Sequence, residues 1–186
     1  MRIFVSSTFR DLRAERDAAL EALRRSGLVP WGMDLFISEP ATPLQVALDE
    51  LQMSDAVVLL IGFKAGSLIP DDPTLTYTGA EFRRAQDLGK PIFVFLKTEA
   101  GAWRNEETIP ALKEALDKFK QTVFDSGITP GYFDSPDRLQ IELLLAMEKW
   151  NAEGRPGCSH ECFRVDNTKY FVYRENGIGG QSSCPK

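Results

Sequence analysis

Residues 56–62, AVVLLIG, form an unbroken run of apolar side chains. A short continuous run of this kind is typical of a β-strand that is covered on both faces, as the strands of parallel sheets are. Similar strand-like runs occur at residues 2–7, 28–36 and 91–97. Each is followed by a longer segment in which apolar residues recur at helical spacing. Because parallel strands need crossover helices, this alternation predicts an α/β fold.

The predicted order is a doubly wound, mostly parallel five-stranded sheet of flavodoxin-like topology. Ser7 or Thr8 is the candidate cap of the first helix, and Pro30 places the second strand at an edge or makes it irregular. A fifth strand is predicted at residues 122–126, TVFDS. Helices are predicted at residues 8–27, 42–55, 77–88, 106–121 and 134–154.

The alternation stops near Gly154, so we expect an α/β domain at residues 1–154 and a small appendage at residues 155–186. The appendage is polar and rich in turn residues, with one strand-like piece, KYFVYR, at residues 169–174. This composition predicts a hairpin or a truncated region.

Composition narrows the possible partners and compartments. The chain carries 22 basic and 27 acidic residues, a net charge of −5, so direct binding of nucleic acid is not expected. No apolar run approaches the ~20 residues of a membrane helix, and the start, MRIFVSSTF, does not resemble a signal peptide. All three cysteines lie in the last 29 residues. We therefore expect a cytoplasmic protein whose main domain does not depend on disulfides.

In doubly wound sheets, ligands bind beyond the carboxyl ends of the strands, where the strand order switches. The first strand ends in Ser6, Ser7 and Thr8, with Arg10 close behind. Hydroxyls and backbone N–H groups at a helix N-terminus suit phosphate or ribose oxygens. The alternative is that these residues serve only as a helix cap.

The segment after the third predicted strand is longer than the ~2–6 residues usual for such a connection. It contains Gly62, Gly66 and Ser67, which let the backbone approach a ligand, and it leads to Tyr77 and Glu81 at the same rim. Neither the G-x-G-x-x-G pattern of dinucleotide sites nor the P-loop pattern is present.

The sole histidine, His160, lies in the predicted appendage, so a Ser–His–Asp triad in the main domain is excluded. The remaining chemistry must use carboxylates, hydroxyls and backbone dipoles. A single glutamate such as Glu81 suits cleavage at an N-glycosidic bond, whose oxocarbenium-like transition state a carboxylate stabilises. The alternative is that Glu81 is a favourable charge near a helix N-terminus.

Several ordered motifs carry a family resemblance. V-S-S-T-F-x-D-L spans Val5–Leu12 and is followed by Glu15 and Arg16; TPLQVALDELQMSD, VVLLIG and YTGAEFRRAQDLGKPIFVF follow at natural spacing. From residue 2 to about residue 97 the chain resembles an uncharacterised family of TIR-like domains. That family is similar to Toll/interleukin-receptor (TIR) domains and, more distantly, to nucleoside deoxyribosyltransferases. The resemblance thus implies a flavodoxin/TIR-like fold.

In both related groups a glutamate on the helix after strand three acts at the anomeric carbon of a nucleoside. In the transferases it begins a Glu-x-x-x-Ala stretch, and Glu81 and Ala85 have that spacing. The resemblance therefore implies that Glu81 is the catalytic nucleophile or oxocarbenium stabiliser. It also implies a substrate site lined by residues at the ends of several strands, namely Ser6, Ser7, Phe9, Tyr77, and Asp34 or Phe36.

This chain departs from the family pattern in two places. Where the family often has an aromatic residue before Gly-Ser, it has Lys64 and Ala65, and Phe63 is the candidate replacement. Where the family often has a second glutamate, it has Gly79.

The resemblance implies a TIR-like hydrolase that cleaves the nicotinamide–ribose bond of NAD, with a linear or cyclic product, as a bacterial antiphage defence or signalling effector. NAD would be the substrate and no cofactor is expected. Self-association or a sensor partner is expected. The alternatives are a non-catalytic TIR-like module for oligomerisation or partner recruitment, and a nucleotide-binding sensor.

A separate hypothesis concerns the appendage. Its Cys158, His160, Cys162 and Cys184 could supply four zinc ligands, although the C-x-H-x-C spacing is unusual. The alternative is a loosely packed tail with free thiols.

Overall fold

The computed structural model describes the backbone of most of the chain and side chains up to residue 154. The described residues are 1–8, 11–32, 41–70, 72–98, 107–154, 160–165, 168–175 and 178–183. The centre is a five-stranded parallel sheet in the order β2-β1-β3-β6-β7, which confirms the predicted doubly wound α/β fold. Its strands are β1 (Arg2–Ser7), β2 (Val29–Trp31), β3 (Ala56–Ile61), β6 (Ile92–Lys97) and β7 (Gly131–Phe133).

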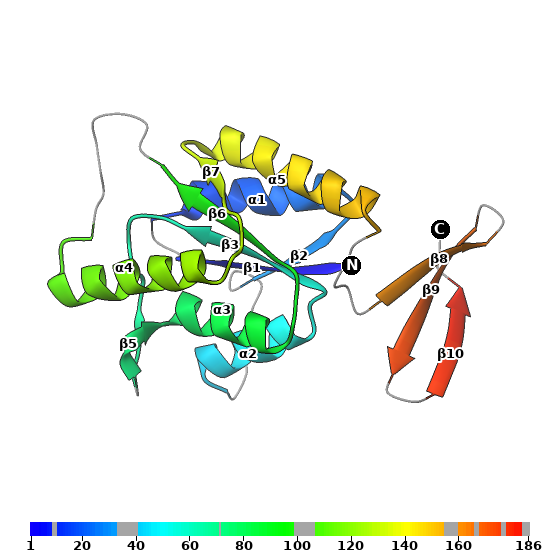
Figure 1. Ribbon diagram of the computed structural model, residues 1–186, viewed down its shortest axis with the longest axis horizontal. Coiled ribbons are helices and arrows are strands. Elements are labelled where there is room, and N and C mark those ends of the chain that lie inside the picture. The colour runs from blue at the N-terminus through cyan, green and yellow to red at the C-terminus, as the bar shows by residue number, and fades with distance from the viewer. Residues whose placement is uncertain are drawn as a thin grey trace.

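Helices cover both faces of this sheet (Figure 1). One face carries α1 (Arg13–Arg25) and α5 (Pro136–Ala152), and the opposite face carries α2 (Pro43–Gln52), α3 (Tyr77–Asp87) and α4 (Pro110–Asp125). All six residues of β3 are buried, as expected of a central strand with helices on both sides.

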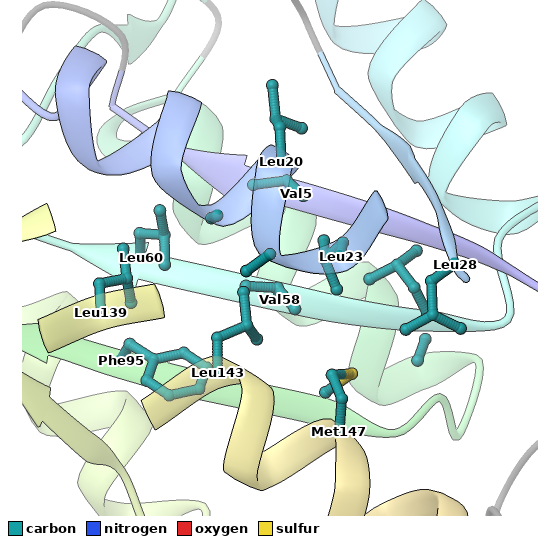
Figure 2. Close-up of a cluster of buried hydrophobic side chains, with 14 of the residues drawn as sticks. Val5, Leu20, Leu23, Leu28, Val58, Leu60, Phe95, Leu139, Leu143 and Met147 are labelled. Atoms are coloured by element: carbon teal, nitrogen blue, oxygen red, sulfur yellow. The ribbon is translucent and has the colours of Figure 1, made fainter. Parts of the chain in front are cut away.

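The largest apolar cluster lies between the sheet and the pair α1 and α5 (Figure 2). Val58 and Leu60 of β3 contribute to it from the sheet, and Leu23 and Leu143 contribute from the two helices. Two smaller clusters lie on the opposite face. The sheet is thus fixed from both sides, and its carboxyl ends are held at one rim.

The side chains of β1 alternate between these two faces, as in any strand. Ile3 and Val5 belong to the cluster under α1 and α5, whereas Phe4 belongs to a cluster on the opposite face. By continuation, Ser6 faces the side of α3 and Ser7 faces the side of α1. Two adjacent serines are therefore presented to different layers of the fold.

The prediction that Ser7 or Thr8 caps the first helix is wrong. Helix α1 begins at Arg13, and its N-cap residue, Leu12, makes no side-chain cap hydrogen bond. Ser7 is still part of β1, where it lies opposite Leu60 of β3. The hydroxyls at the end of β1 are therefore available for other contacts.

The prediction of a strand at residues 122–126 is also wrong. Helix α4 continues to Asp125, and Val123 lies two turns beyond Leu116 on the same buried face. The fifth strand is β7, only three residues long, which pairs with β6. A Cβ at Gly131 would lie 2.8 Å from Phe95 Cδ1, so glycine is needed at that pairing.

The long connection between β3 and α3 contains a two-stranded antiparallel hairpin, β4 (Leu68–Ile69) and β5 (Asp72–Thr76). Thr76 caps α3, since its hydroxyl oxygen accepts a hydrogen bond from Gly79 N at 2.9 Å. The N–H group of Tyr77 donates to Ser67 O at 3.2 Å and closes the connection. The start of α3 is thereby fixed against the sheet.

The end of the chain forms a separate three-stranded antiparallel sheet in the order β10-β9-β8. The predicted strand KYFVYR lies within β9 (Thr168–Glu175), between β8 (His160–Val165) and β10 (Ile178–Ser183). The expected hairpin thus has a third strand, and the domain boundary at residue 154 stays a prediction. Among the described residues, no helix has the length and apolarity needed to cross a bilayer.

Candidate active site at the carboxyl ends of β1 and β3

Glu81 lies in the second turn of α3 and points into the protein, with only 3% of its surface exposed. The hydroxyl of Ser6, near the carboxyl end of β1, donates a hydrogen bond to Glu81 Oε2. Strands β1 and β3 are neighbours, and the strand order reverses between them. The carboxyl group is therefore fixed at the topological switch point, where doubly wound folds bind ligands.

Burial raises the pKa of Glu81 from its ordinary value of 4.5 to about 7. The hydrogen bond from Ser6 and the positive charge of Arg16 act in the opposite direction but do not offset the loss of hydration. At neutral pH the carboxyl group is therefore about half ionised. It can act as a carboxylate toward a developing cation, and it can also exchange a proton near physiological pH.

Arg16 is buried on the other side of β1, with 1% of its surface exposed. Its Nη1 atom donates to Ser7 Oγ at 2.7 Å. A Cβ placed at Gly32, just after β2, would lie 2.7 Å from Arg16 Nη2, so the missing side chain at this position makes room for the guanidinium. Ser6 and Ser7 thus contact groups of opposite charge on opposite faces of the sheet.

A second buried charge on α1, that of Glu15, contacts the end of β6. Glu15, 5% exposed, forms an ion pair with Lys97 at the end of β6, with Lys97 Nζ 2.5 Å from Glu15 Oε1. Glu15 and Arg16 belong to the family motif in the sequence, and neither was among the predicted site residues. A local signal was available, because Arg16 follows Leu12 by four residues and lies on the apolar stripe of its helix.

Asp11 joins the segment after β1 to the segment after β3. Its Oδ1 atom accepts the hydrogen bond of the Thr8 hydroxyl, and its Oδ2 atom accepts the Lys64 N–H at 3.3 Å. A Cβ at Gly62 would lie 2.7 Å from Asp11 Oδ2. The glycine that was predicted to admit a ligand is therefore required by the approach of this carboxylate.

A depression with about 200 Å³ of empty space lies beside these contacts. Its lining is mostly apolar and includes Phe119, and Thr8, Lys64 and Thr78 are its polar residues. Thr78 is almost one helical turn before Glu81 on α3. Another depression, of about 310 Å³, lies between α3 and α4. Within the described part of the chain, Glu81 lines neither of the two.

The other predicted site residues are placed as follows. Gly66 and Ser67 are exposed at the rim, and Gly66 has a φ of 76°, which favours glycine. The half-buried Phe63 is directed toward α4, with Lys120 Nζ 5.9 Å from its ring centroid. Tyr77 is half-buried at the start of α3.

The other predicted residues lie outside what the structure describes. For His160 and Cys162 only the backbone is described, so the zinc hypothesis stays a prediction. The predicted residues outside the described ranges are Phe9, Arg10, Asp34, Phe36, Cys158 and Cys184.

The fold and the buried glutamate define a doubly wound α/β domain with a candidate acidic site at its switch point. Residues 2–148 match the model of one protein family, so the chain belongs to the family described as "Domain of unknown function (DUF4062)". The search of curated proteins found no significant match.

Several solved structures are similar to this one. The CMP N-glycosidase BcmB of Clostridium botulinum is 16% identical, with 78% of this chain and 99% of that chain covered and a TM-score of 0.48. A 2-deoxyribosyltransferase of Bacillus psychrosaccharolyticus is 19% identical, with 75% and 90% covered and a TM-score of 0.44. A candidate quinone reductase of Klebsiella pneumoniae is 12% identical, with 90% and 89% covered and a TM-score of 0.43. All three TM-scores lie below 0.5.

Proposed function

We propose that this domain hydrolyses the N-glycosidic bond of a nucleotide and that Glu81 faces the anomeric carbon during the reaction. One observation carries the proposal: Glu81 is buried at the switch point, and a hydroxyl from the end of β1 holds its carboxyl group in place. A carboxylate of this kind can stabilise positive charge on a sugar, because burial strengthens its electrostatic effect.

The reaction needs few protein groups. The bond between C1′ and the ring nitrogen breaks, and its electron pair stays on the nitrogen. Ionised Glu81 stabilises the oxocarbenium-like ribose or forms a covalent bond to C1′. Water then adds to C1′ and releases a proton.

We further propose NAD as the substrate, with nicotinamide as the leaving group. The nicotinamide ring is a cation in NAD and leaves as a neutral molecule, so the step needs no general acid. That requirement fits a main domain whose sequence holds no histidine. The positive ring also favours the ionised form of a nearby Glu81. The resemblance to TIR-like domains supports the same substrate and a cytoplasmic role in bacterial defence or signalling, regulated by self-association or a sensor partner.

The test measures the release of nicotinamide from NAD by chromatography, at several protein concentrations. CMP and adenosine are tried as alternative substrates. Glu81→Gln keeps the shape of the side chain and removes its charge, so we expect at least a hundredfold loss of rate. Glu21→Gln, at a partly exposed carboxylate of α1 that pairs with Arg25, is the matched control and should retain full rate. Turnover that survives in the Glu81→Gln protein would remove Glu81 from the mechanism.

A specific observation favours a second candidate function, a non-catalytic module for oligomerisation or recruitment. Glu81 lines neither described depression, and its contact with Ser6 joins α3 to β1. A purely structural link would have these properties. Folded protein that releases no nicotinamide at any concentration supports this module; if it still binds NAD, it is a nucleotide sensor instead.

A further inference from the structure

We propose that the turn of residues 64–66, after β3, is a phosphate-binding site, and that Glu107 is an internal competitor whose carboxylate a substrate phosphate displaces. The inference deepens the proposed function, on which it rests for the nature of the substrate, and makes that substrate a phosphate-bearing nucleotide. It stands on the contacts of two consecutive backbone amides.

Both amides already donate to carboxylate oxygens. Lys64 N donates to Asp11 Oδ2 at 3.3 Å, and Ala65 N donates to Glu107 Oε2 at 3.4 Å. Successive backbone N–H groups in a tight turn form concave sites for anions, and the φ of 76° at Gly66 shows the left-handed conformation that such turns use. These distances exceed the usual ~2.9–3.0 Å, so the two bonds are weak and a stronger acceptor can replace one of them.

The residues around the turn carry groups of the kind that bind phosphate. Lys64, Thr8 and Thr78 line the depression of about 200 Å³ of which Ala65 also forms part, and the Thr8 hydroxyl donates to Asp11. Lysine ammonium groups, hydroxyls and backbone amides hold phosphate oxygens in proteins. The floor is apolar, which suits the less polar parts of the same ligand.

The lining of this depression is related in sequence to Glu81 and Ser6, and this relation indicates the class of ligand. Thr78 precedes Glu81 by three residues on α3, and Thr8 follows Ser6 by two residues at the end of β1. The depression beside the turn thus has lining residues on α3 and just after β1, the two elements that hold the Glu81–Ser6 pair. A molecule with its sugar beside Glu81 and an anionic group on the turn is a nucleotide and not a free nucleoside.

Glu107 precedes α4 and can release the turn while it keeps its contacts at the start of that helix. Its other oxygen, Oε1, accepts from Thr108 N at 3.1 Å and Ile109 N at 3.3 Å. These amides precede α4, whose N-cap residue Ile109 makes no side-chain cap bond. Oε1 of Glu107 can therefore keep its hydrogen bonds at the start of α4 while Oε2 loses its hydrogen bond from Ala65 N.

Charge makes Glu107 a competitor. Two carboxylates contact the turn, those of Asp11 and Glu107, and Lys64 is the basic residue of the turn itself. An added phosphate is repelled by Glu107 at short range, where salt screens little. Glu107→Gln keeps an oxygen that can accept the Ala65 N–H and removes only the charge. Neutralising this residue therefore strengthens phosphate binding.

The experiment measures binding of pyrophosphate, AMP and adenosine by calorimetry, with backbone ¹⁵N NMR to locate the site. We expect Glu107→Gln to lower the Kd for pyrophosphate and AMP at least about fivefold and to leave adenosine unchanged. Lys64→Met should raise the Kd for both anions about tenfold or more. Glu114→Gln, an exposed position on α4, is the control for charge and should change nothing.

The amide signals of Lys64 and Ala65 should move on adding pyrophosphate. Unchanged or weaker pyrophosphate binding in folded Glu107→Gln protein would overturn the proposal, as would binding that ignores Lys64→Met. Failure of the proposed function would look different: NAD is not cleaved, yet pyrophosphate still binds with this dependence on Glu107.

Discussion

Replacing Glu81 by glutamine should change how the stability of the domain depends on pH. The pKa of Glu81 is about 7 in the folded protein and its ordinary value is 4.5, so between these values the folded state binds more protons than the unfolded state. The free energy of unfolding must then fall as the pH rises through this window. Glutamine has no charge to bury and lacks this contribution.

The expected size follows from the two pKa values. Full ionisation of Glu81 costs roughly 3 kcal/mol, and most of this cost, about 2–3 kcal/mol, arises between pH 5 and pH 8. The stability of Glu81→Gln relative to the natural protein should therefore rise by about 2–3 kcal/mol over that range. In a protein of this size, such a change raises the relative melting temperature by roughly 5–10 °C at pH 8.

The assay is urea unfolding followed by circular dichroism at half-unit steps from pH 5 to pH 8, for the natural protein and for Glu81→Gln. Taking the difference between the two curves cancels every other titrating group. Glu50→Gln, a more exposed carboxylate paired with Arg2 at the opposite end of β1, is a control whose difference curve should not show this rise. Parallel curves for the natural protein and Glu81→Gln would refute the reasoning, because the carboxyl group would then titrate alike in both states.

Three further changes have definite expectations. Ser6→Ala removes the hydrogen bond that lowers the pKa of Glu81, so the ¹³C NMR titration midpoint of Glu81 should move above that of the natural protein; an unchanged midpoint would contradict the contact. Arg16→Met removes a positive charge that also lowers this pKa, so it should raise the same midpoint, and a downward shift would show that the charge has no such effect. Gly62→Ala places a Cβ 2.7 Å from Asp11 Oδ2 and should lower the free energy of unfolding by about 1–3 kcal/mol in urea titrations, whereas full stability would mean that the two segments separate without cost.

The strand and helix alternation could be predicted because each central element carries its own periodic signal. The apolar run of β3 appears in the structure as expected, and the helix predicted from residue 42 appears as α2, with Thr42 as its N-cap. β7 could not be found this way, because three residues carry no periodicity. Its position is set by pairing with β6 and by the close approach of Gly131 to Phe95, both of which are long-range.

At the site, the sequence identified Ser6, Ser7 and Glu81 but not how they are connected. Hydroxyls before a helical segment suggested a cap, yet pairing with β3 keeps Ser7 in its strand and delays the helix to Arg13. The partners of Thr8 and Lys64 depend on Asp11, whose contacts span 53 residues in the case of Lys64. Such contacts are set by tertiary packing and leave no local pattern.

The alternation of side chains along β1 explains how one strand end can bind an acidic and a basic residue, Glu81 and Arg16, and keep them apart. Ser6 is bound to Glu81 on the α3 side, and Arg16 is bound to Ser7 on the α1 side. The arginine reaches Glu81 only as a lesser influence on a pKa that burial dominates. If both groups lay on one face in close contact, the carboxylate would be held ionised and committed to its partner. Because adjacent residues of a strand face opposite sides, Glu81 and Arg16 stay apart, and burial holds the pKa of Glu81 near neutrality.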